Sequence, residues 1–368
     1  MKILIINWRD IKNPEAGGAE VHLHEISKRI AARGHAVTVL ASRFEGAAER
    51  DEVDGVKVVR CGGKFSFNFH VPRAYRRLLH DEAFDVVVDD INKIPFYTPL
   101  YVRRPILALS HHLFAGTIFL ETAFPLALYV YLSEALIAPV YRRTAFVAVS
   151  ESTRQELLRR GIPPCNVEVV HNAVDHAAFT PGDGAKSDQP LIAYLGRIKR
   201  YKRVGLVLDV FKNLSGRFPT ARLAIVGSGD YVPELKRQAE RLGIAGRVEF
   251  TGFVSEQKKI EILRKAHVVI NPSSKEGWGV TVTEANACGT PVVASNVPGL
   301  RDAVVDGKTG FLVEYGDVDA FAARVGQILS DDRLRTELGR EAVKWAGQFD
   351  WDRSAESILK IMERLVVG

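Results

Sequence analysis

Short apolar runs rich in β-branched residues recur along this 368-residue chain and alternate with stretches of helical spacing. The runs 3–6 and 36–40 are continuous rather than alternating, as expected for strands buried on both faces of a parallel sheet. Between them, Leu23, Ile26 and Ile30 have the spacing of one helix face. This alternation predicts doubly wound α/β units with right-handed crossovers.

The alternation is interrupted once, at 181–190, a segment rich in Pro, Gly, Asp and Ser that has no periodicity. We therefore predict two Rossmann-like domains, at 1–180 and 191–350, joined by this linker and followed by a terminal helix at 351–368. The predicted strands are 3–6, 36–40, 56–59, 86–88, 106–109, 146–149 and 167–170 in the first domain, and 191–195, 222–226, 248–250, 267–270, 292–294 and 311–313 in the second.

Composition narrows the class of protein without naming a ligand. A hydrophobic content of 46% fits a globular protein, and the net charge of +6 is modest and spread along the chain. Such a charge suits small anionic ligands or an anionic membrane surface, and no nucleic-acid-binding signature accompanies it. Cys61, Cys165 and Cys288 are far apart and lack metal-ligand spacing, which predicts a reducing, cytoplasmic location.

The run 276–284, EGWGVTVTE, follows a predicted strand and a Pro-Ser-Ser turn and opens a helix. The free N–H groups of a helix N-terminus bind anions, whereas the carboxylates of Glu276 and Glu284 accept hydrogen bonds from hydroxyls. A nucleotide sugar carries both kinds of group. The alternative is a capped surface helix with two solvated acids. The intervening candidates for donor binding are Gly277, Trp278, Gly279 and Val280.

Two cations, Arg197 and Lys202, follow the first predicted strand of the second domain, just after Gly196. An Arg fork and a Lys point charge beside a helix N-terminus can neutralise a leaving diphosphate without a metal. The alternative is a basic surface loop.

Glycines at two further strand-to-helix turns suggest close approach of a backbone to a phosphate. Gly17 and Gly18 follow the first strand of the chain, and Gly227 and Gly229 follow the strand 222–226. A lone Gly-Gly pair is equally a tight turn.

Aromatic and histidine side chains complete the set of candidates. Phe253 and Val254 follow the strand 248–250, where they would either contact a nucleobase or form a hydrophobic staple for the next helix. His111 and His112 end the strand 106–109, at a position from which imidazole can bond a sugar hydroxyl.

Together these motifs resemble glycosyltransferase family 4, whose members are retaining transferases. The resemblance covers essentially the whole chain and rests on the GGAE opening, the strand-end His, the GRxxxxK element, the VGSG turn and EGWGVTVTE, the most specific of them. It implies the GT-B fold, in which two Rossmann-like domains face each other across a cleft. The domain 1–180 would bind the acceptor, the domain 191–350 the nucleotide sugar, and the last helix would cross back to the first domain.

The resemblance also implies roles for individual residues. Gly17 and Gly18 resemble the backbone contacts to the diphosphate, and Arg197 and Lys202 its counter-charges. The remaining roles place Glu276 on the donor-sugar hydroxyls, Glu284 on the ribose and His111 near the sugar, with His112 as an alternative in register.

The family's chemistry implies front-side attack with retention, in which the departing phosphate oxygen takes the acceptor proton and the enzyme positions and stabilises. We therefore expect a hexosyltransferase that uses a UDP- or GDP-sugar and no metal or other cofactor. The alternatives are a GT-B epimerase and a non-catalytic nucleotide-sugar-binding protein. A pyridoxal-phosphate phosphorylase is disfavoured, since no lysine stands out as a Schiff-base site.

The acceptor side is suggested by apolar stretches of the first domain. The stretch 113–141 is apolar and aromatic, with Glu121 and Glu134 as its charged residues, and Arg142 and Arg143 follow it. Pro125 and the two acids argue against a membrane span. We expect peripheral docking at an anionic inner membrane face and a lipid-linked acceptor in envelope glycan synthesis, the alternative being core helix. A second basic–aromatic stretch comprises Phe65, Phe67, Phe69, Arg73, Arg76 and Arg77; the acceptor-side candidates are Asn92, Phe96, Tyr97 and His112.

Overall fold

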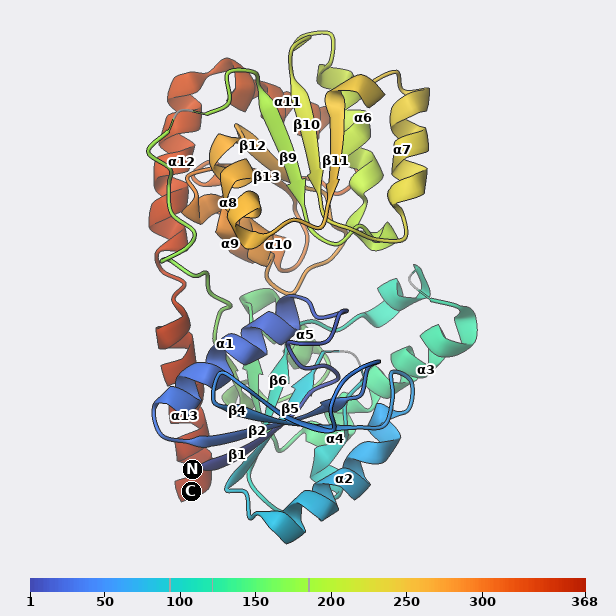
Figure 1. The fold of residues 1–368 in the computed structure, drawn as a ribbon, viewed down its shortest axis with the longest axis vertical. Coiled ribbons are helices and arrows are strands. Elements are labelled where there is room, and N and C mark those ends of the chain that lie inside the picture. Colours follow the sequence, from blue (N-terminus) through green and yellow to red (C-terminus); the bar gives the residue numbers. More distant parts are fainter. Residues whose placement is uncertain (93, 121, 185) are drawn as a thin grey trace. The chain divides into compact units, whose positions relative to one another are not determined.

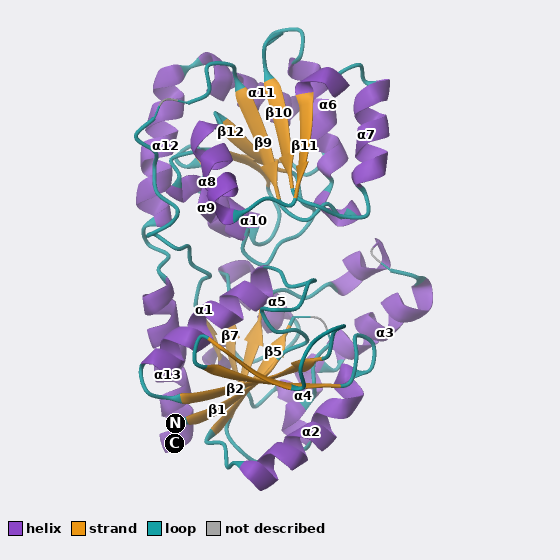
Figure 2. Cartoon of the chain, viewed as in Figure 1, coloured by secondary structure: helices purple, strands orange, loops and turns teal. Residues whose placement is uncertain are grey.

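The computed structural model describes residues 1–92, 94–120, 122–184 and 186–368 and divides the chain into two compact units. Unit 1 comprises Met1–Asn172 and Trp351–Gly368, and unit 2 comprises Ala173–Asp350. Figures 1 and 2 show that each unit is a sheet covered by helices. The prediction of two Rossmann-like domains is thereby confirmed.

Unit 1 contains an eight-stranded sheet in the order β3-β4-β2-β1-β5-β6-β7-β8. Its pairs are parallel except for β3 with β4, an antiparallel edge pair that the sequence did not predict. The strand β3 has the sequence RDEV, which lacks the apolar residues of a buried strand. The strands are β1 Lys2–Ile6, β2 Ala36–Ser42, β3 Arg50–Val53, β4 Val56–Cys61, β5 Val86–Ile91, β6 Ile106–Ser110, β7 Ala145–Ala148 and β8 Val167–Val169.

The helices of unit 1 include the last one of the chain. The terminal helix α13 lies on α1, where Arg29 Nε is 3.0 Å from Asp352 Oδ1. Ser354 Oγ donates to the carbonyl of His171 at 2.9 Å, close to the end of the first segment of the unit. The helices are α1 Gly18–Ala32, α2 Phe67–Asp81, α3 Phe124–Ala135, α4 Ile137–Tyr141, α5 Glu151–Arg159 and α13 Trp351–Val367, with short 3₁₀ turns η1 Thr98–Leu100, η2 Ala115–Leu120 and η3 Pro164–Asn166.

The apolar stretch 113–141 is only partly core. Its helices bury Ala127, Val130 and Ile137 but leave large apolar side chains exposed, with Phe124 at 68% and Leu132 at 54%. The segment Phe124–Tyr141 is long and apolar enough to cross a membrane by length and composition alone, and a third of it is buried in the protein. Glu121 lies outside the described residues.

Unit 2 has a fully parallel six-stranded sheet in the order β11-β10-β9-β12-β13-β14, the strand order of a dinucleotide-binding Rossmann fold. The strands are β9 Leu191–Leu195, β10 Arg222–Val226, β11 Val248–Gly252, β12 Val268–Asn271, β13 Val292–Ser295 and β14 Gly310–Val313. The helices are α6 Val204–Leu214, α7 Val232–Arg241, α8 Glu256–Lys265, α9 Val280–Ala287, α10 Leu300–Ala303, α11 Val318–Ser330 and α12 Asp332–Ala346, with η4 Arg200–Lys202 and η5 Ala245–Arg247.

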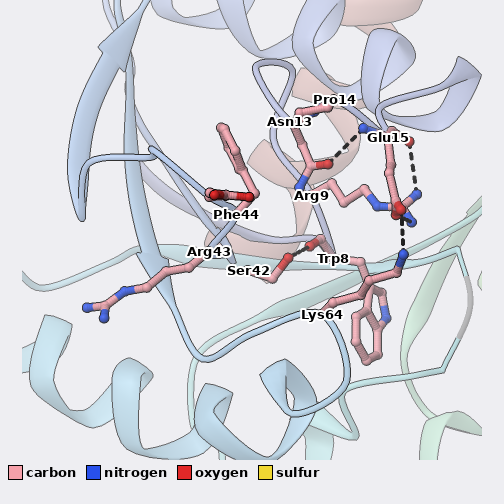
Figure 3. Close-up of a pocket in the computed structure, with 10 residues that line it drawn as sticks. Trp8, Arg9, Asn13, Pro14, Glu15, Ser42, Arg43, Phe44 and Lys64 are labelled. Atoms are coloured by element: carbon pink, nitrogen blue, oxygen red, sulfur yellow. Dashed lines mark hydrogen bonds and ion pairs between the residues drawn. The ribbon is translucent and has the colours of Figure 1, made fainter.

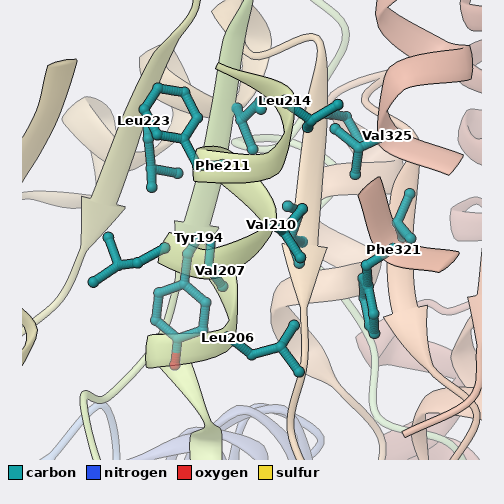
Figure 4. Packing of buried hydrophobic residues seen from close by; sticks show 14 of the residues in the cluster. Tyr194, Leu206, Val207, Val210, Phe211, Leu214, Leu223, Phe321 and Val325 are labelled. Atoms are coloured by element: carbon teal, nitrogen blue, oxygen red, sulfur yellow. The ribbon is translucent and has the colours of Figure 1, made fainter. Parts of the chain in front are cut away.

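The core of unit 2 is continuous from the sheet into its helices. Phe211 of α6 and Phe321 of α11 are fully buried in one cluster with strand residues such as Tyr194 and Leu223, and Figure 4 shows Phe211 beside Leu223. The segment predicted as a linker packs against this unit, because Lys186 Nζ donates to Thr290 Oγ1 at 2.6 Å and Ser187 N donates to the carbonyl of Lys265 at 3.1 Å.

Candidate functional site

The motif residues of unit 2 gather where the strand order reverses. The strands β9 and β12 are neighbours although two strands and their connections separate them in sequence. Ligands of open α/β sheets bind beyond the carboxyl ends of the strands at such a point. The GRxxxxK element follows β9, and the run EGWGVTVTE follows β12. The fold therefore brings this basic motif and this acidic motif together.

Lys202 and Glu276 form an ion pair in which each side chain is 15% exposed. The loop that carries Lys202 is tied to the one after β12, because Ser274 donates its N–H and its hydroxyl to the carbonyl of Tyr201 at 3.2 and 3.1 Å. Burial is the largest single influence and disfavours the Lys202 ammonium, but the charge and the hydrogen bond of Glu276, together with Tyr201, raise the pKa of Lys202 above its usual value. Lys202 is therefore a fixed cation at this edge.

Arg197 lies in the same loop and is exposed. Its carbonyl accepts a hydrogen bond from the buried Tyr194 hydroxyl at 3.1 Å, which fixes the backbone of the loop. An exposed guanidinium on a fixed backbone, near a buried ammonium, suits a ligand with several phosphate oxygens.

The glycines of the VGSG turn have a different role from the one predicted. A Cβ on Gly227 would lie 2.0 Å from the carbonyl oxygen of Gly196, and one on Gly229 would lie 1.9 Å from that of Ile198. Ile198 N also donates to the carbonyl of Ser228 at 2.9 Å. These glycines let the loops after β9 and β10 pack backbone to backbone, and thereby shape the site.

Glu284 of α9 pairs with a lysine that no sequence motif indicated. Lys259 Nζ of α8 lies 2.7 Å from Glu284 Oε1, whereas Oε2 is buried without a hydrogen-bond partner among the described residues. Burial raises the pKa of Glu284, and the charge of Lys259 opposes this. An unoccupied carboxylate oxygen is a ready acceptor for a hydroxyl.

The EGWG turn places Gly279 at the N-cap of α9 with a φ of 83°, a left-handed conformation that favours glycine. The Trp278 side chain is 2% exposed and its ring lies 4.8 Å from that of Phe349, between centroids. The indole of Trp278 therefore belongs to the core, and its place among the donor-binding candidates stays a prediction that concerns its backbone.

Phe253 is 88% exposed after β11, so it lacks the burial that a hydrophobic staple would require. Val254 is half-buried beside it, and Ser255 caps the following helix through its hydroxyl. An exposed aromatic ring at a strand end is available to a planar ligand.

In unit 1, Gly17 and Gly18 begin helix α1 after β1. The N–H of Gly17 donates to Glu20 Oε2 at 2.7 Å, so the capping acid already occupies the amide that was predicted to meet a phosphate. The prediction for the Gly17 amide is therefore wrong in this structure, whereas Gly18 remains at the first turn, where N–H groups lack helical partners.

His111 and His112 end β6 in different surroundings. His111 is 4% exposed and its Nε2 lies 3.1 Å from Oδ1 of the fully buried Asp90 on β5. His112 is half-buried and its ring lies 4.9 Å from that of Phe114. Sequence reasoning did not identify Asp90, although its position next to the end of β5 was a usable signal.

The acceptor-side candidates are mostly structural. Phe96 is buried against Phe67, so its predicted place in an acceptor pocket is wrong. Asn92 donates to Asn7 Oδ1 at 2.8 Å, and the Tyr97 hydroxyl donates to the carbonyl of Ser133 at 3.0 Å. Phe67 is itself 0% exposed, so it does not belong to the predicted basic–aromatic surface, of which Phe65 and Phe69 are exposed.

A pocket of about 400 Å³ lies instead at the carboxyl ends of β1 and β2 (Figure 3). Glu15 lies between two cations there: its Oε2 is 2.6 Å from Arg9, and its other oxygen is paired with Lys64. The lining residues are Trp8, Arg9, Asn13, Pro14, Glu15, Ser42, Arg43, Phe44, Glu45 and Lys64.

Comparison with known proteins covers both units. The family "Glycosyltransferase Family 4" matches residues 16–178, and "Glycosyl transferases group 1" matches residues 178–345. A D-inositol 3-phosphate glycosyltransferase of Mycolicibacterium smegmatis is 36% identical over 211 residues, which are 54% of this chain and 47% of that protein. One from Acidothermus cellulolyticus is 37% identical over 218 residues, 55% of this chain and 48% of that protein. The chain thus spans about half the length of these relatives.

Solved structures share the fold. Sucrose-phosphate synthase from Thermosynechococcus elongatus has a TM-score of 0.84 at 20% identity, over 100% of this chain and 99% of that one. Anabaena HepE in complex with UDP-glucose has a TM-score of 0.78 at 20% identity, over 99% and 100% of the two chains. With both domain families matched in order and the two Rossmann-like units in place, the chain belongs to the family 4 type of glycosyltransferases.

Proposed function

We propose that the protein is a retaining glycosyltransferase that moves a hexose from a UDP- or GDP-sugar to a hydroxyl acceptor. The observation that carries this proposal is the Lys202–Glu276 pair beside the exposed Arg197 at the switch point of the unit 2 sheet. Cations there suit the diphosphate, Glu276 suits sugar hydroxyls, and Glu284 suits the ribose. The relatives are glycosyltransferases, which supports sugar transfer, and HepE, which shares the fold, binds UDP-glucose.

In the proposed reaction, the bond between the anomeric carbon and the diphosphate oxygen breaks while the acceptor oxygen bonds to the same carbon on the same face. The acceptor proton passes to the departing phosphate oxygen. Arg197 and Lys202 stabilise the negative charge that develops on the leaving diphosphate. Glu276 and His111 hold the sugar, so that positioning and electrostatics supply the catalysis.

The donor is tested by thermal-shift measurements with UDP, GDP, UDP-glucose and GDP-mannose, because a ligand that binds the folded state stabilises it by RT ln(1+[L]/Kd). The donor that gives the largest shift is then incubated with acceptor mixtures, and the products are analysed by mass spectrometry. Transfer to a new hydroxyl is expected. Epimerised donor without transfer, or binding without turnover, would replace the proposal with an epimerase or a binding protein.

We propose that transfer needs no metal, because two cations and the N-terminus of α9 meet the leaving group. Activity should therefore survive EDTA. Complete loss of activity in EDTA, restored by a divalent cation, would contradict this part of the proposal.

We propose that the acceptor binds unit 1 in the pocket of about 400 Å³. Arg9, Arg43 and Lys64 line it, which favours an acceptor that carries an anionic group. Glu15 holds two of these cations and would have to release them. Transfer to phosphorylated polyols should exceed transfer to the free polyols, and Lys64→Met should remove that preference while leaving donor binding unchanged.

We further propose that unit 1 docks on an anionic membrane, which suits a lipid-linked acceptor in cell-envelope glycan synthesis. Large apolar side chains around α3 face solvent, and the exposed Arg142 and Arg143 follow α4. Apolar surface with adjoining cations is typical of interfacial anchoring. The exposed apolar residues are Phe119, Phe124, Leu126, Leu128, Tyr129, Tyr131, Leu132 and Leu136.

Membrane docking is tested by sedimentation with phosphatidylglycerol and phosphatidylcholine vesicles at low and high salt. Binding to the anionic vesicles at low salt is expected, weakened by salt. The variant Phe124→Ser/Leu132→Ser should lose binding, whereas Val367→Ser, a change at a side chain 89% exposed outside this surface, should retain it. Failure to bind anionic vesicles at low salt would leave sugar transfer standing with a soluble acceptor.

A further inference from the structure

Three ionisable side chains from three elements meet in the interior of unit 1. Asp90 comes from β5, His111 follows β6 and His22 comes from α1, and they are 0, 4 and 0% exposed. The His22 and His111 rings lie edge to face, with 5.0 Å between centroids and an angle of 90°. Buried ionisable groups are unfavourable unless something compensates them, so their clustering calls for a role.

The Asp90 carboxylate is directed at His111. Its Oδ1 lies 3.1 Å from His111 Nε2, and neither carboxylate oxygen has a hydrogen-bond donor of standard geometry among the described residues. Its neighbour Asp89 differs, because Oδ2 of Asp89 accepts bonds from the hydroxyls of Tyr141 at 2.5 Å and Thr98 at 2.7 Å. Two adjacent buried carboxylates therefore have separate partners, and that of Asp90 is the imidazole.

The structure shows which ring nitrogen of His111 faces the protein interior. Its carbonyl accepts from Thr153 Oγ1 at 3.0 Å, which anchors the backbone after β6. Nε2 is buried against Asp90. Among the described residues, Nδ1 of His111 is not one of the buried nitrogens that lack a partner. An imidazole with one nitrogen held by a carboxylate presents the other in a single orientation and protonation role.

The His22 ring packs against the His111 imidazole and does not compete with Asp90 for its nitrogen. Burial, and then the nearby His111, hold the pKa of His22 well below its usual value, so the ring stays neutral. The Trp351 ring of α13 backs it, with 5.7 Å between centroids. A further charge near the cluster is that of Glu20 of α1, which disfavours ionisation of Asp90, as burial does more strongly; Arg9 lies 4.0 Å from Glu20.

We infer that Asp90 is the positioning residue of His111: its carboxylate holds the Nε2–H, so that Nδ1 faces the donor sugar. This inference rests on the proposed function, which assigns His111 to the sugar. Asp90 does not touch substrate in this scheme. It acts by fixing the tautomer and the orientation of the ring that does.

The test uses Asp90→Asn, which preserves size but can donate to Nε2 and so permits the opposite tautomer. We expect kcat to fall about 10- to 100-fold, the scale found for residues that orient metal-binding histidines, with the Kd for the nucleoside diphosphate unchanged. The control Asp89→Asn alters the adjacent buried carboxylate and should leave kcat within about threefold, since its partners are Tyr141 and Thr98.

Two further measurements separate positioning from loss of structure. In His111→Ala, the additional change Asp90→Asn should have no further effect on kcat, because the two residues act as one unit. Nitrogen-15 NMR of the His111 ring should show Nε2 protonated in the wild type and a population protonated at Nδ1 in Asp90→Asn. Wild-type kcat in Asp90→Asn, or an unchanged ring spectrum, would overturn the inference. The spectrum tests whether Asp90 sets the tautomer of His111 even if the protein transfers no sugar. Failure of this inference can therefore be distinguished from failure of the proposed function.

Discussion

Lys202 and Glu276 are ion-paired at the edge of the unit 2 sheet, each largely shielded from water. The cation proposed to meet the diphosphate is thus held by the acid proposed to meet the sugar. Breaking a shielded pair by removing one partner leaves the other charge uncompensated. The two residues are therefore expected to act as one unit in donor binding.

We predict that Lys202→Met weakens nucleoside-diphosphate binding by about 1.5–3 kcal/mol, the range for a charged hydrogen bond. Glu276→Gln should nearly abolish transfer, and the double variant should be clearly non-additive in donor binding. Isothermal titration with UDP and GDP measures these effects. Lys199→Met is the matched control, because Lys199 pairs with the exposed Asp230 in the same region. Equal losses in Lys199→Met and Lys202→Met would show a general charge effect.

A second prediction concerns the packed loops of the same site. Gly229→Ala places a Cβ where the Ile198 carbonyl now lies, so the loop after β9 must move. Donor affinity should fall at least tenfold, as expected when binding groups are displaced by about 1 Å. Gly246→Ala is the control, since a Cβ there meets no atom within 4 Å. Equal affinity of both variants for the donor nucleotide would contradict the assigned role of Gly229.

The sequence was sufficient for the parallel strands and insufficient for the edge strand β3 and for the partners of charged residues. Strands such as β9 and β10 were predicted because apolar continuity is a local property. The pairing of Lys259 with Glu284 joins residues 25 positions apart on two helices, and Asp90 meets His111 across neighbouring strands. Such contacts depend on strand order, which no local pattern encodes.

The same limit applies to the side chains of aromatic residues. Trp278 and Phe96 lie in or near motifs, yet both rings are core. An aromatic side chain near a strand end fills the interior or lines a site according to what packs above it, here Phe349 and Phe67. Composition alone does not distinguish the two outcomes.

A third prediction concerns a buried pair in unit 1. Arg60 is 1% exposed and its Nε and one terminal nitrogen each lie 2.8 Å from an oxygen of Asp10. Arg60→Met should destabilise unit 1 by about 3–5 kcal/mol, because Asp10 would be left buried without its counter-charge. Arg50→Met, which breaks the exposed pair with Asp81, should change stability by about 1 kcal/mol or less. Hydrogen exchange of β1 and β4 measures both; similar protection in the two variants would contradict the prediction.

The final prediction is a pH dependence that arises from Asp89. Burial raises the pKa of Asp89 to about 6 from an ordinary value of 3.8, although hydrogen bonds from Tyr141 and Thr98 oppose this. The folded state therefore retains a proton that the unfolded state has lost between these two pH values. The contribution of Asp89 to the free energy of unfolding is therefore fully present below about pH 4 and is lost as the pH rises through 6. The loss is about 3 kcal/mol, at 1.36 kcal/mol per pKa unit.

Asp89→Asn removes this titration while keeping an acceptor for the Tyr141 hydroxyl. Relative to the wild type, the variant should gain up to about 3 kcal/mol of stability between pH 4 and pH 7, because only the wild type must ionise a buried carboxyl. Hydrogen exchange of β5 and β6, compared between the two proteins at each pH, cancels the titration of groups that they share. A difference that is the same at pH 4 and pH 7 would mean that Asp89 ionises in the folded protein as easily as in water.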